Sequence, residues 1–106
     1  MSEVKMQGYT LEDAKASVGK GWHKILEILF DAKPKNTIIV QVKEKYAGLR
    51  FYTSGTTEEY HDLINVAGWM SECICETCGQ VGQVIRYGWW KTRCPKCQEE
   101  WKKAEE

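Results

Sequence analysis

Cys75-Glu-Thr-Cys78 is followed, after fifteen residues, by a second pair of the same form, Cys94-Pro-Lys-Cys97. Two residues between paired cysteines let one tight turn aim both sulfurs at a single ion. The intervening stretch is long enough for a β-hairpin that brings the second turn opposite the first. Gly79 follows the first pair, where a positive φ helps the backbone amides face the thiolates. The pattern predicts a C-terminal zinc ribbon in which a structural Zn²⁺ is held by Cys75, Cys78, Cys94 and Cys97.

Other uses of paired cysteines fit this chain less well. A disulfide framework needs an oxidising compartment and an even number of cysteines, whereas this chain has five and no apolar targeting segment in residues 1–20. A thioredoxin-type site uses one Cys-x-x-Cys pair in a βαβ setting, and the expected elements do not alternate in that way. A rubredoxin-like iron site uses similar pairs and remains an alternative to zinc. Cys73 is interpreted as a thiol at a helix end, with a reactive or substitute-ligand role as the alternative.

Size and charge set further bounds. At 106 residues the chain supports one domain, or a small domain with a metal-stapled appendage. Its formal net charge is zero, so the overall field gives no general attraction to nucleic acid. The charge is unevenly distributed: residues 33–50 and 79–98 are basic, and residues 51–74 are acidic. No apolar run approaches the ~20 residues of a membrane span, so we expect a protein of the bacterial cytoplasm.

Helical spacing and capping signals predict the N-terminal elements. Thr10 and Asp13 form a helix start, and Gly19 and Gly21 interrupt the run. A second helix is expected over residues 22–31, before Pro34. Its apolar face consists of Trp22, Ile25, Leu26, Leu29 and Phe30.

Two β-rich runs, residues 37–42 and 49–53, predict an antiparallel hairpin in which Gly48 serves the turn. Strict alternation places Ile39 and Gln41 on one face, and Ile38, Val40 and Val42 on the other. A capping box at Thr56–Glu59 predicts a helix through about Ser71. Its expected apolar stripe consists of Tyr60, Leu63, Ile64, Ala67 and Met70.

The expected fold class is therefore α+β: N-terminal helices, an antiparallel hairpin, a second helix, and a four-cysteine ribbon with a short C-terminal helix. We expect the helix–hairpin–helix part to occupy residues 1–73 and the ribbon residues 74–106, packed as one unit.

Two groups of residues are candidate partner contacts. Trp89 and Trp90 lie in the expected ribbon hairpin among basic residues, which suits a protein-binding anchor or a stacking platform for single-stranded nucleic acid. Burial of both rings against the helices is the competing interpretation. Lys45, Arg50 and Tyr52 form a second possible patch, for which a solvated sheet face is the alternative. The candidate partner-binding residues are Trp89, Trp90, Arg86, Lys91, Arg93, Arg50 and Tyr52.

The stretch Lys43-Glu-Lys-Tyr-Ala-Gly-Leu-Arg-Phe-Tyr52, with Gly21-Trp22, the Cys-Glu-x-Cys-Gly segment and a Gly-Trp strand, resembles a family of small phage and prophage proteins. The resemblance covers most of residues 21–97. It implies a phage-type origin and a zinc ribbon, and it supplies no catalytic residues. Many members of that family pair Cys with His in the second half-site, whereas this chain has Cys94 and Cys97.

Three functions remain open from the sequence. No catalytic residues are expected, because His23 and His61 lie on separate helices and a closed four-cysteine site leaves no coordination position for water. Binding to a host protein is the first hypothesis, and the resemblance suggests inhibition of a defence nuclease such as a CRISPR effector as one form of it. A nucleic-acid-binding ribbon, such as a small regulator, is the alternative. A structural role in a virion or in packaging is the third possibility.

Overall fold

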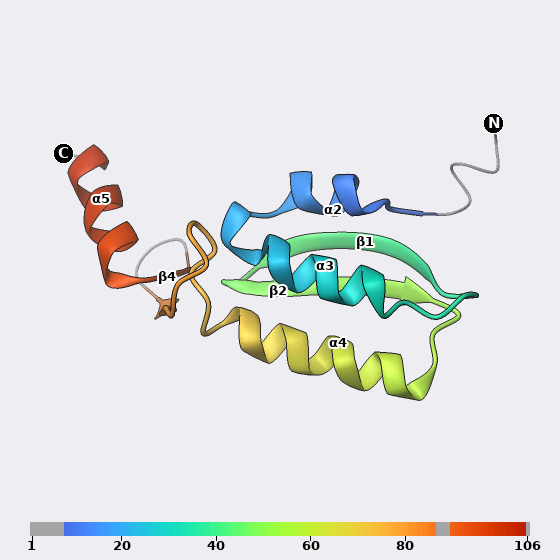
Figure 1. The fold of residues 1–106 in the computed structure, drawn as a ribbon. Helices are drawn as coiled ribbons and strands as arrows, with labels where there is room; N and C mark the ends of the chain where they lie inside the picture. Colours follow the sequence, from blue (N-terminus) through green and yellow to red (C-terminus); the bar gives the residue numbers. More distant parts are fainter. Residues whose placement is uncertain (1–7, 87–89, 106) are drawn as a thin grey trace.

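Helices on one side of a two-stranded antiparallel hairpin form the larger part of the fold, and a cysteine-rich tail extends from one end of it (Figure 1). The computed structural model describes residues 8–86 and 90–105. The order is helices, hairpin, helix and then a tail containing the four clustered cysteines. The predicted α+β fold class is confirmed.

The N-terminal helices begin where the capping signals lie. α2 (Leu11–Ser17) starts with a reciprocal capping box between Thr10 and Asp13. A 3₁₀ turn, η1 (Lys20–Trp22), leads into α3 (His23–Asp31). The predicted face of α3 is buried, apart from Phe30, which is half-buried.

The hairpin consists of β1 (Ile38–Lys45) and β2 (Gly48–Ser54). The predicted alternation of β1 is wrong beyond Ile39, because the register shifts between Ile39 and Gln41. Val40 is the extra residue of this β-bulge, so Ile39 and Val42 both face the core while Val40 and Gln41 are exposed. A single inserted residue exchanges the faces of everything that follows it.

The hairpin turn does not include Gly48, which was predicted to serve it. Lys45 pairs with Gly48, so Tyr46 and Ala47 are the two turn residues, with φ of 54° and 70°. Positive φ at both positions is the two-residue turn that matches strand twist, and it is unusual without glycine or asparagine. Gly48 is instead the first residue of β2.

α4 (Glu58–Ser71) packs beside β2 (Figure 1). The N-cap is Thr57, whose side chain accepts from the Tyr60 amide, and not the predicted box at Thr56–Glu59. Tyr60 and Ala67 are buried as predicted, but Met70 is exposed. Ser71 takes the inward position at this end, where its hydroxyl accepts from the Leu49 amide.

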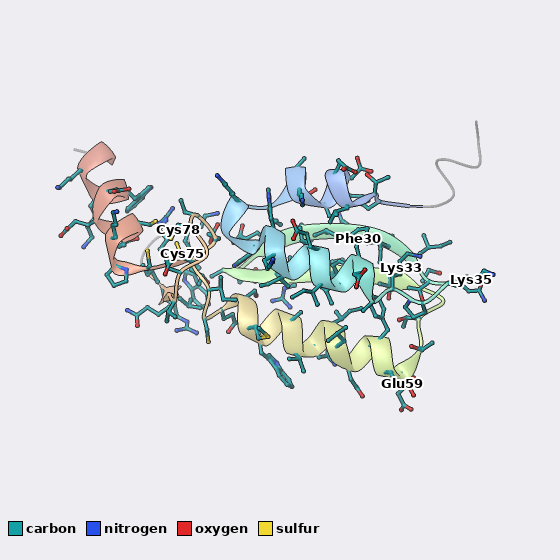
Figure 2. All side chains as sticks on the ribbon, in the orientation of Figure 1. Phe30, Lys33, Lys35, Glu59, Cys75 and Cys78 are labelled. Atoms are coloured by element: carbon teal, nitrogen blue, oxygen red, sulfur yellow. The ribbon has the colours of Figure 1, made fainter. Side chains whose placement is uncertain are left out.

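The hydrophobic core lies between the hairpin and the helices, and it is made from α2, α3, α4 and the inward face of both strands. Trp22, Leu26 and Leu29 are its largest fully buried helical side chains. Figure 2 shows Lys35 and Glu59 at one end of this body and Cys75 and Cys78 at the other. The cysteines of the tail therefore lie at the end of the fold opposite to Lys35 and Glu59 (Figure 2).

The tail contains two very short strands, β3 (Gln83–Ile85) and β4 (Lys91–Arg93), paired antiparallel, and the helix α5 (Pro95–Glu105). An isolated bridge between Ile74 and Val81 closes the loop that carries the first cysteine pair. Within residues 8–86 and 90–105, no helix is long and apolar enough to cross a membrane.

We expect Tyr60→Phe to lower the free energy of unfolding by about 1–2 kcal/mol at pH 7, because the Tyr60 hydroxyl donates to the Leu29 carbonyl at the end of α3. Burial raises the pKa of Tyr60 to about 12. The unfolded chain releases this proton near pH 10, so the hydroxyl's contribution is complete below pH 10 and is lost as pH rises toward 12. The difference between wild type and variant, measured by urea unfolding at pH 7 and pH 11, should therefore shrink. If the difference were the same at pH 7 and pH 11, the raised pKa of Tyr60 would be contradicted.

Candidate metal centre and the surfaces around it

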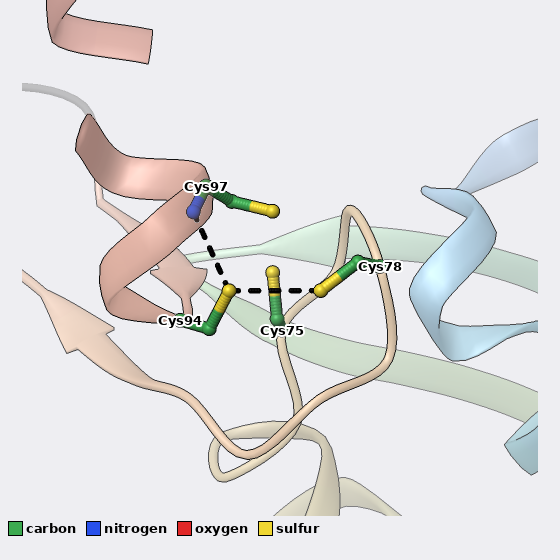
Figure 3. Close-up of side chains that lie close together, drawn as sticks. All are labelled: Cys75, Cys78, Cys94 and Cys97. Carbon is green, nitrogen blue, oxygen red and sulfur yellow. Dashed lines mark hydrogen bonds between the residues drawn. The ribbon is translucent and has the colours of Figure 1, made fainter. Parts of the chain in front are cut away.

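The four paired cysteines converge on one point at the base of the tail. Their sulfur atoms all lie within 4.8 Å of one another, and the Cys78 and Cys94 sulfurs are 3.6 Å apart (Figure 3). A tetrahedral Zn²⁺ with Zn–S bonds near 2.3 Å requires sulfurs about 3.8 Å apart. The four thiols therefore fit a single tetrahedral metal ion, and Cys73 is outside the cluster.

The first cysteine turn is shaped by backbone hydrogen bonds. The Gly79 amide donates to the Cys75 carbonyl over 2.9 Å, and the Cys75 amide donates to the Gln80 carbonyl over 2.7 Å. Gly79 has a φ of 89°, which is the conformation predicted for the residue after the pair. Cys75 is fully buried, while Cys78 lies on the exposed side of the turn.

The second pair lies on the first turn of α5. Cys94 directly precedes the helix, and its sulfur accepts from the Cys97 amide at 3.4 Å. The Gln98 amide donates to the Cys94 carbonyl over 3.0 Å. A free helix N-terminus favours negative charge, so this position suits a thiolate ligand.

The thiols differ in how easily they lose a proton. Burial raises the pKa of Cys75, but hydrogen bonds from the backbone amides of Cys94, Cys78 and Thr77 outweigh burial and lower the pKa to about 6. Hydrogen bonding with Cys94 is the main reason that the pKa of Cys97 is raised. The backbone amides therefore favour the thiolate form of Cys75, and a bound cation would favour deprotonation of the other thiols.

A network centred on Glu76 attaches the tail to the body. The buried Glu76 carboxylate accepts from the Thr92 amide, and it lies 3.5 Å from the Lys91 amine. Lys91 also pairs with Glu44 at 3.3 Å, and the second oxygen of Glu44 accepts from the Ala47 amide. The Thr92 hydroxyl donates to the Ala47 carbonyl over 2.6 Å, so β4 lies directly against the positive-φ hairpin turn.

Four of the candidate partner-binding residues share one surface. Arg50 and Tyr52 line a groove of 510 Å³ between β2 and α4. Arg50, Arg86 and Trp90 line a second hollow of 370 Å³ between the hairpin turn and the tail. The two hollows meet at Arg50 and Glu72. The structure therefore joins the two patches that the sequence suggested separately.

The remaining candidates are placed elsewhere. Lys91 forms ion pairs with Glu44 and Glu76 in the network that attaches the tail to the body. Arg93 lies over the Trp101 ring, 4.9 Å from its centre, at α5. Trp89 falls outside the described residues. The two histidines are apart: His23 contacts the Lys15 carbonyl, and His61 lines the groove beside β2.

Sequence reasoning missed three positions. Tyr46 lies in the turn and packs edge-on against Trp90, with ring centres 6.1 Å apart. Trp69 is 70% exposed and lines the groove. Gly21 was expected only to interrupt a helix, yet its amide donates to the Glu76 carbonyl and its α-carbon faces the first cysteine turn. Of these three positions, only Trp69 could have been found from the sequence, because helical spacing from the buried residues of α4 places it on the exposed side.

No protein-family model, no curated protein and no solved structure matches the chain. Its function is therefore inferred from its own residues.

Removing the metal with a chelator is expected to disorder the tail and leave the body folded, because the apolar core contains none of the cysteines. Elemental analysis should find one zinc per chain. Hydrogen exchange should show lost protection in residues 74–105 and retained protection in α3 and α4. Cys94→Ser should abolish metal binding, whereas the matched variant Cys73→Ser should retain it. A metal-free tail with full protection would refute the metal site.

Gly21→Ala is expected to destabilise the protein by roughly 3 kcal/mol. An added Cβ would lie 1.9 Å from the Cys75 carbonyl oxygen and 2.6 Å from the Gly79 amide nitrogen, both of them backbone atoms. The matched change Gly68→Ala meets only the Leu49 carbonyl oxygen at 3.6 Å within α4, and should stabilise by up to ~1 kcal/mol. Denaturant unfolding measures the free energy of unfolding of both variants. An equal change in the two variants would contradict the close packing of η1 on the first cysteine turn.

Proposed function

We propose that this protein is a non-enzymatic, zinc-stabilised binding protein of phage or prophage type that acts by binding a host protein in the bacterial cytoplasm. The favoured form is inhibition of a defence nuclease such as a CRISPR effector. The observation that carries the proposal is an exposed apolar stripe on α4, on the side of the helix turned away from the core.

The stripe consists of Val66, Trp69, Met70 and Cys73, spaced at i, i+3, i+4 and i+7 along the helix and its C-terminal turn. Val66, Trp69 and Met70 are 42%, 70% and 49% exposed. The core-facing side of α4 is already complete with Tyr60, Ala67 and Ser71. A second apolar stripe on a helix that is already packed indicates a contact with another molecule.

The charges around the stripe favour a basic partner. Residues 51–74 contain four acidic side chains and no lysine or arginine. Three of the acids, Glu58, Glu59 and Asp62, are exposed on α4 itself, and Glu72 follows its end. Enzymes that handle nucleic acid carry basic surfaces for the phosphate backbone. An acidic surface with a central tryptophan is complementary to such an enzyme, which supports the nuclease hypothesis.

The chemistry of the cysteine cluster supports a structural metal. Four thiolates complete a tetrahedral zinc and leave no position for a reacting water. The metal then serves to hold the tail, and the exposed aromatic side chains serve recognition.

The proposal is tested with immobilised, zinc-loaded protein and lysate of a bacterial host. The variant Trp69→Ser/Met70→Ser should lose a host protein that wild type retains, because it removes the centre of the stripe. Ile28→Ser is the matched control, since Ile28 is 53% exposed on α3. The retained protein is then purified, and its binding and nuclease activity are measured with each variant.

A dissociation constant raised by at least tenfold in the stripe variant, with Ile28→Ser unchanged, is the expected outcome. Retention of the same proteins by all three forms would overturn the proposal.

A further inference from the structure

The outward face of the β1–β2 hairpin has a chemistry opposite to that of α4. On this face Lys43 is directly opposite Arg50, Gln41 is opposite Tyr52, and Lys45 is opposite Gly48. The inward face carries the buried pair Val42 and Phe51, which packs on the helices. We call the surface formed by these outward side chains, the turn residue Tyr46 and two neighbouring residues of the tail the open face. Its residues are Lys43, Lys45, Tyr46, Arg50 and Tyr52 of the hairpin, with Arg86 and Trp90 of the tail.

Like charges are placed together on the open face without compensation. Lys43 and Arg50 are cross-strand neighbours, an arrangement that destabilises a sheet. Within the described part of the chain, no carboxylate oxygen lies within 4.0 Å of the charged nitrogens of Lys43, Lys45 or Arg50. Glu72 lines both adjoining hollows and offsets part of this positive charge. An excess of positive charge remains, and it is complementary to an anionic ligand.

Every exposed aromatic ring of the open face has a cation beside it. The Lys43 amine lies 5.8 Å from the centre of the Tyr52 ring, and the Lys45 amine lies 5.6 Å from that of Tyr46. The Arg86 guanidinium carbon lies 5.0 Å from the Trp90 ring centre. Such pairs offer an unpaired base a ring for stacking and its phosphate a positive charge.

The rings follow a continuous path across the molecule. Tyr52 lines the groove beside α4, Arg50 lies at the junction of the two hollows, and Tyr46 and Trp90 line the second hollow. The hydrogen bond between the Thr92 hydroxyl and the Ala47 carbonyl fixes the tail end of this path against the hairpin turn. The path therefore presents stacking groups in a fixed order rather than as scattered surface residues.

The geometry points to a binding site for single-stranded nucleic acid on the open face of the hairpin. A duplex fits less well, because its bases are already stacked and unavailable to the rings. An acidic protein would satisfy the cations but would leave the three ring–cation pairs without a specific role. The sequence suggested nucleic-acid binding by the ribbon alone, whereas four of the seven open-face residues that form this site come from the hairpin strands and one from their turn.

The site is tested by fluorescence anisotropy with a labelled dT12 oligonucleotide and the full zinc-loaded chain at 50 mM salt. We expect saturable binding that weakens with salt, with a log–log slope of about −3 for four phosphate contacts. Lys43→Gln/Arg50→Gln should reduce both the affinity and the slope. Tyr52→Leu should reduce the affinity roughly 5- to 150-fold and leave the slope unchanged, because it removes stacking and no charge.

Matched controls separate this site from general charge effects. Lys24→Gln removes an exposed lysine from α3 and should leave the affinity unchanged. Retained zinc content and unchanged circular dichroism show that each variant is folded. A 12-base-pair duplex should bind more weakly than dT12 at equal salt, and poly-L-glutamate should compete poorly.

Two results would overturn the site. One is the absence of dT12 binding at 50 mM salt. The other is equal competition by poly-L-glutamate together with an unaffected Tyr52→Leu variant, which would reveal an acidic-protein surface instead. Neither result bears on host-protein capture through α4. Val66→Ser/Met70→Ser changes two stripe residues that do not line the groove, and it should retain dT12 binding within about threefold, so the two proposals fail separately.

Discussion

The convergence of four sulfur atoms is the constraint on which the tail depends. Among its described residues from Cys75 to Cys97, the buried side chains are two cysteines, Glu76 and Thr92, and no large apolar residue. Strands of three residues cannot fold by themselves without a core. A metal ion bound by the four cysteines would close the loop between the two turns and supply the missing stabilisation, as is usual in domains too small to bury enough apolar surface.

The second requirement is that the tail be held against the body in one orientation. Glu76 does this from inside the cysteine turn, because its carbonyl accepts from Gly21 while its carboxylate accepts from the Thr92 amide and pairs with Lys91. Lys91 and Thr92 then contact the hairpin next to Ala47. Two residues with positive φ are tolerated in this turn because the surrounding hydrogen bonds fix them, which is the usual condition for local strain.

The fold presents two surfaces of opposite character, which adjoin at the groove lined by Arg50, Trp69 and Glu72. The outer side of α4 is apolar and acidic, centred on Trp69, and the open face of the hairpin is basic and aromatic. With zero net charge, neither surface is detectable from the overall charge of the chain. A protein that bound a nucleic-acid enzyme with one surface and single-stranded nucleic acid with the other would bring the two together. A metal held by the four cysteines would fix the tail that carries Trp90 and Arg86 beside the hairpin.

The sequence by itself determined the α+β fold class, the Thr10 helix cap, the buried face of α3 and the spacing of the four cysteines, because these depend on local spacing and on ligand chemistry. It predicted the wrong turn residues for the hairpin. It also predicted the wrong outward residues of β1, since the single bulged residue Val40 reverses the faces and the composition of the strand does not reveal a bulge. It also assigned Met70 to the core. Only the tertiary structure decided that Arg50 and Trp90 line one hollow and that Lys91 pairs with Glu44 of the hairpin. The residues of each pair lie forty or more positions apart in the sequence, where no local pattern carries information.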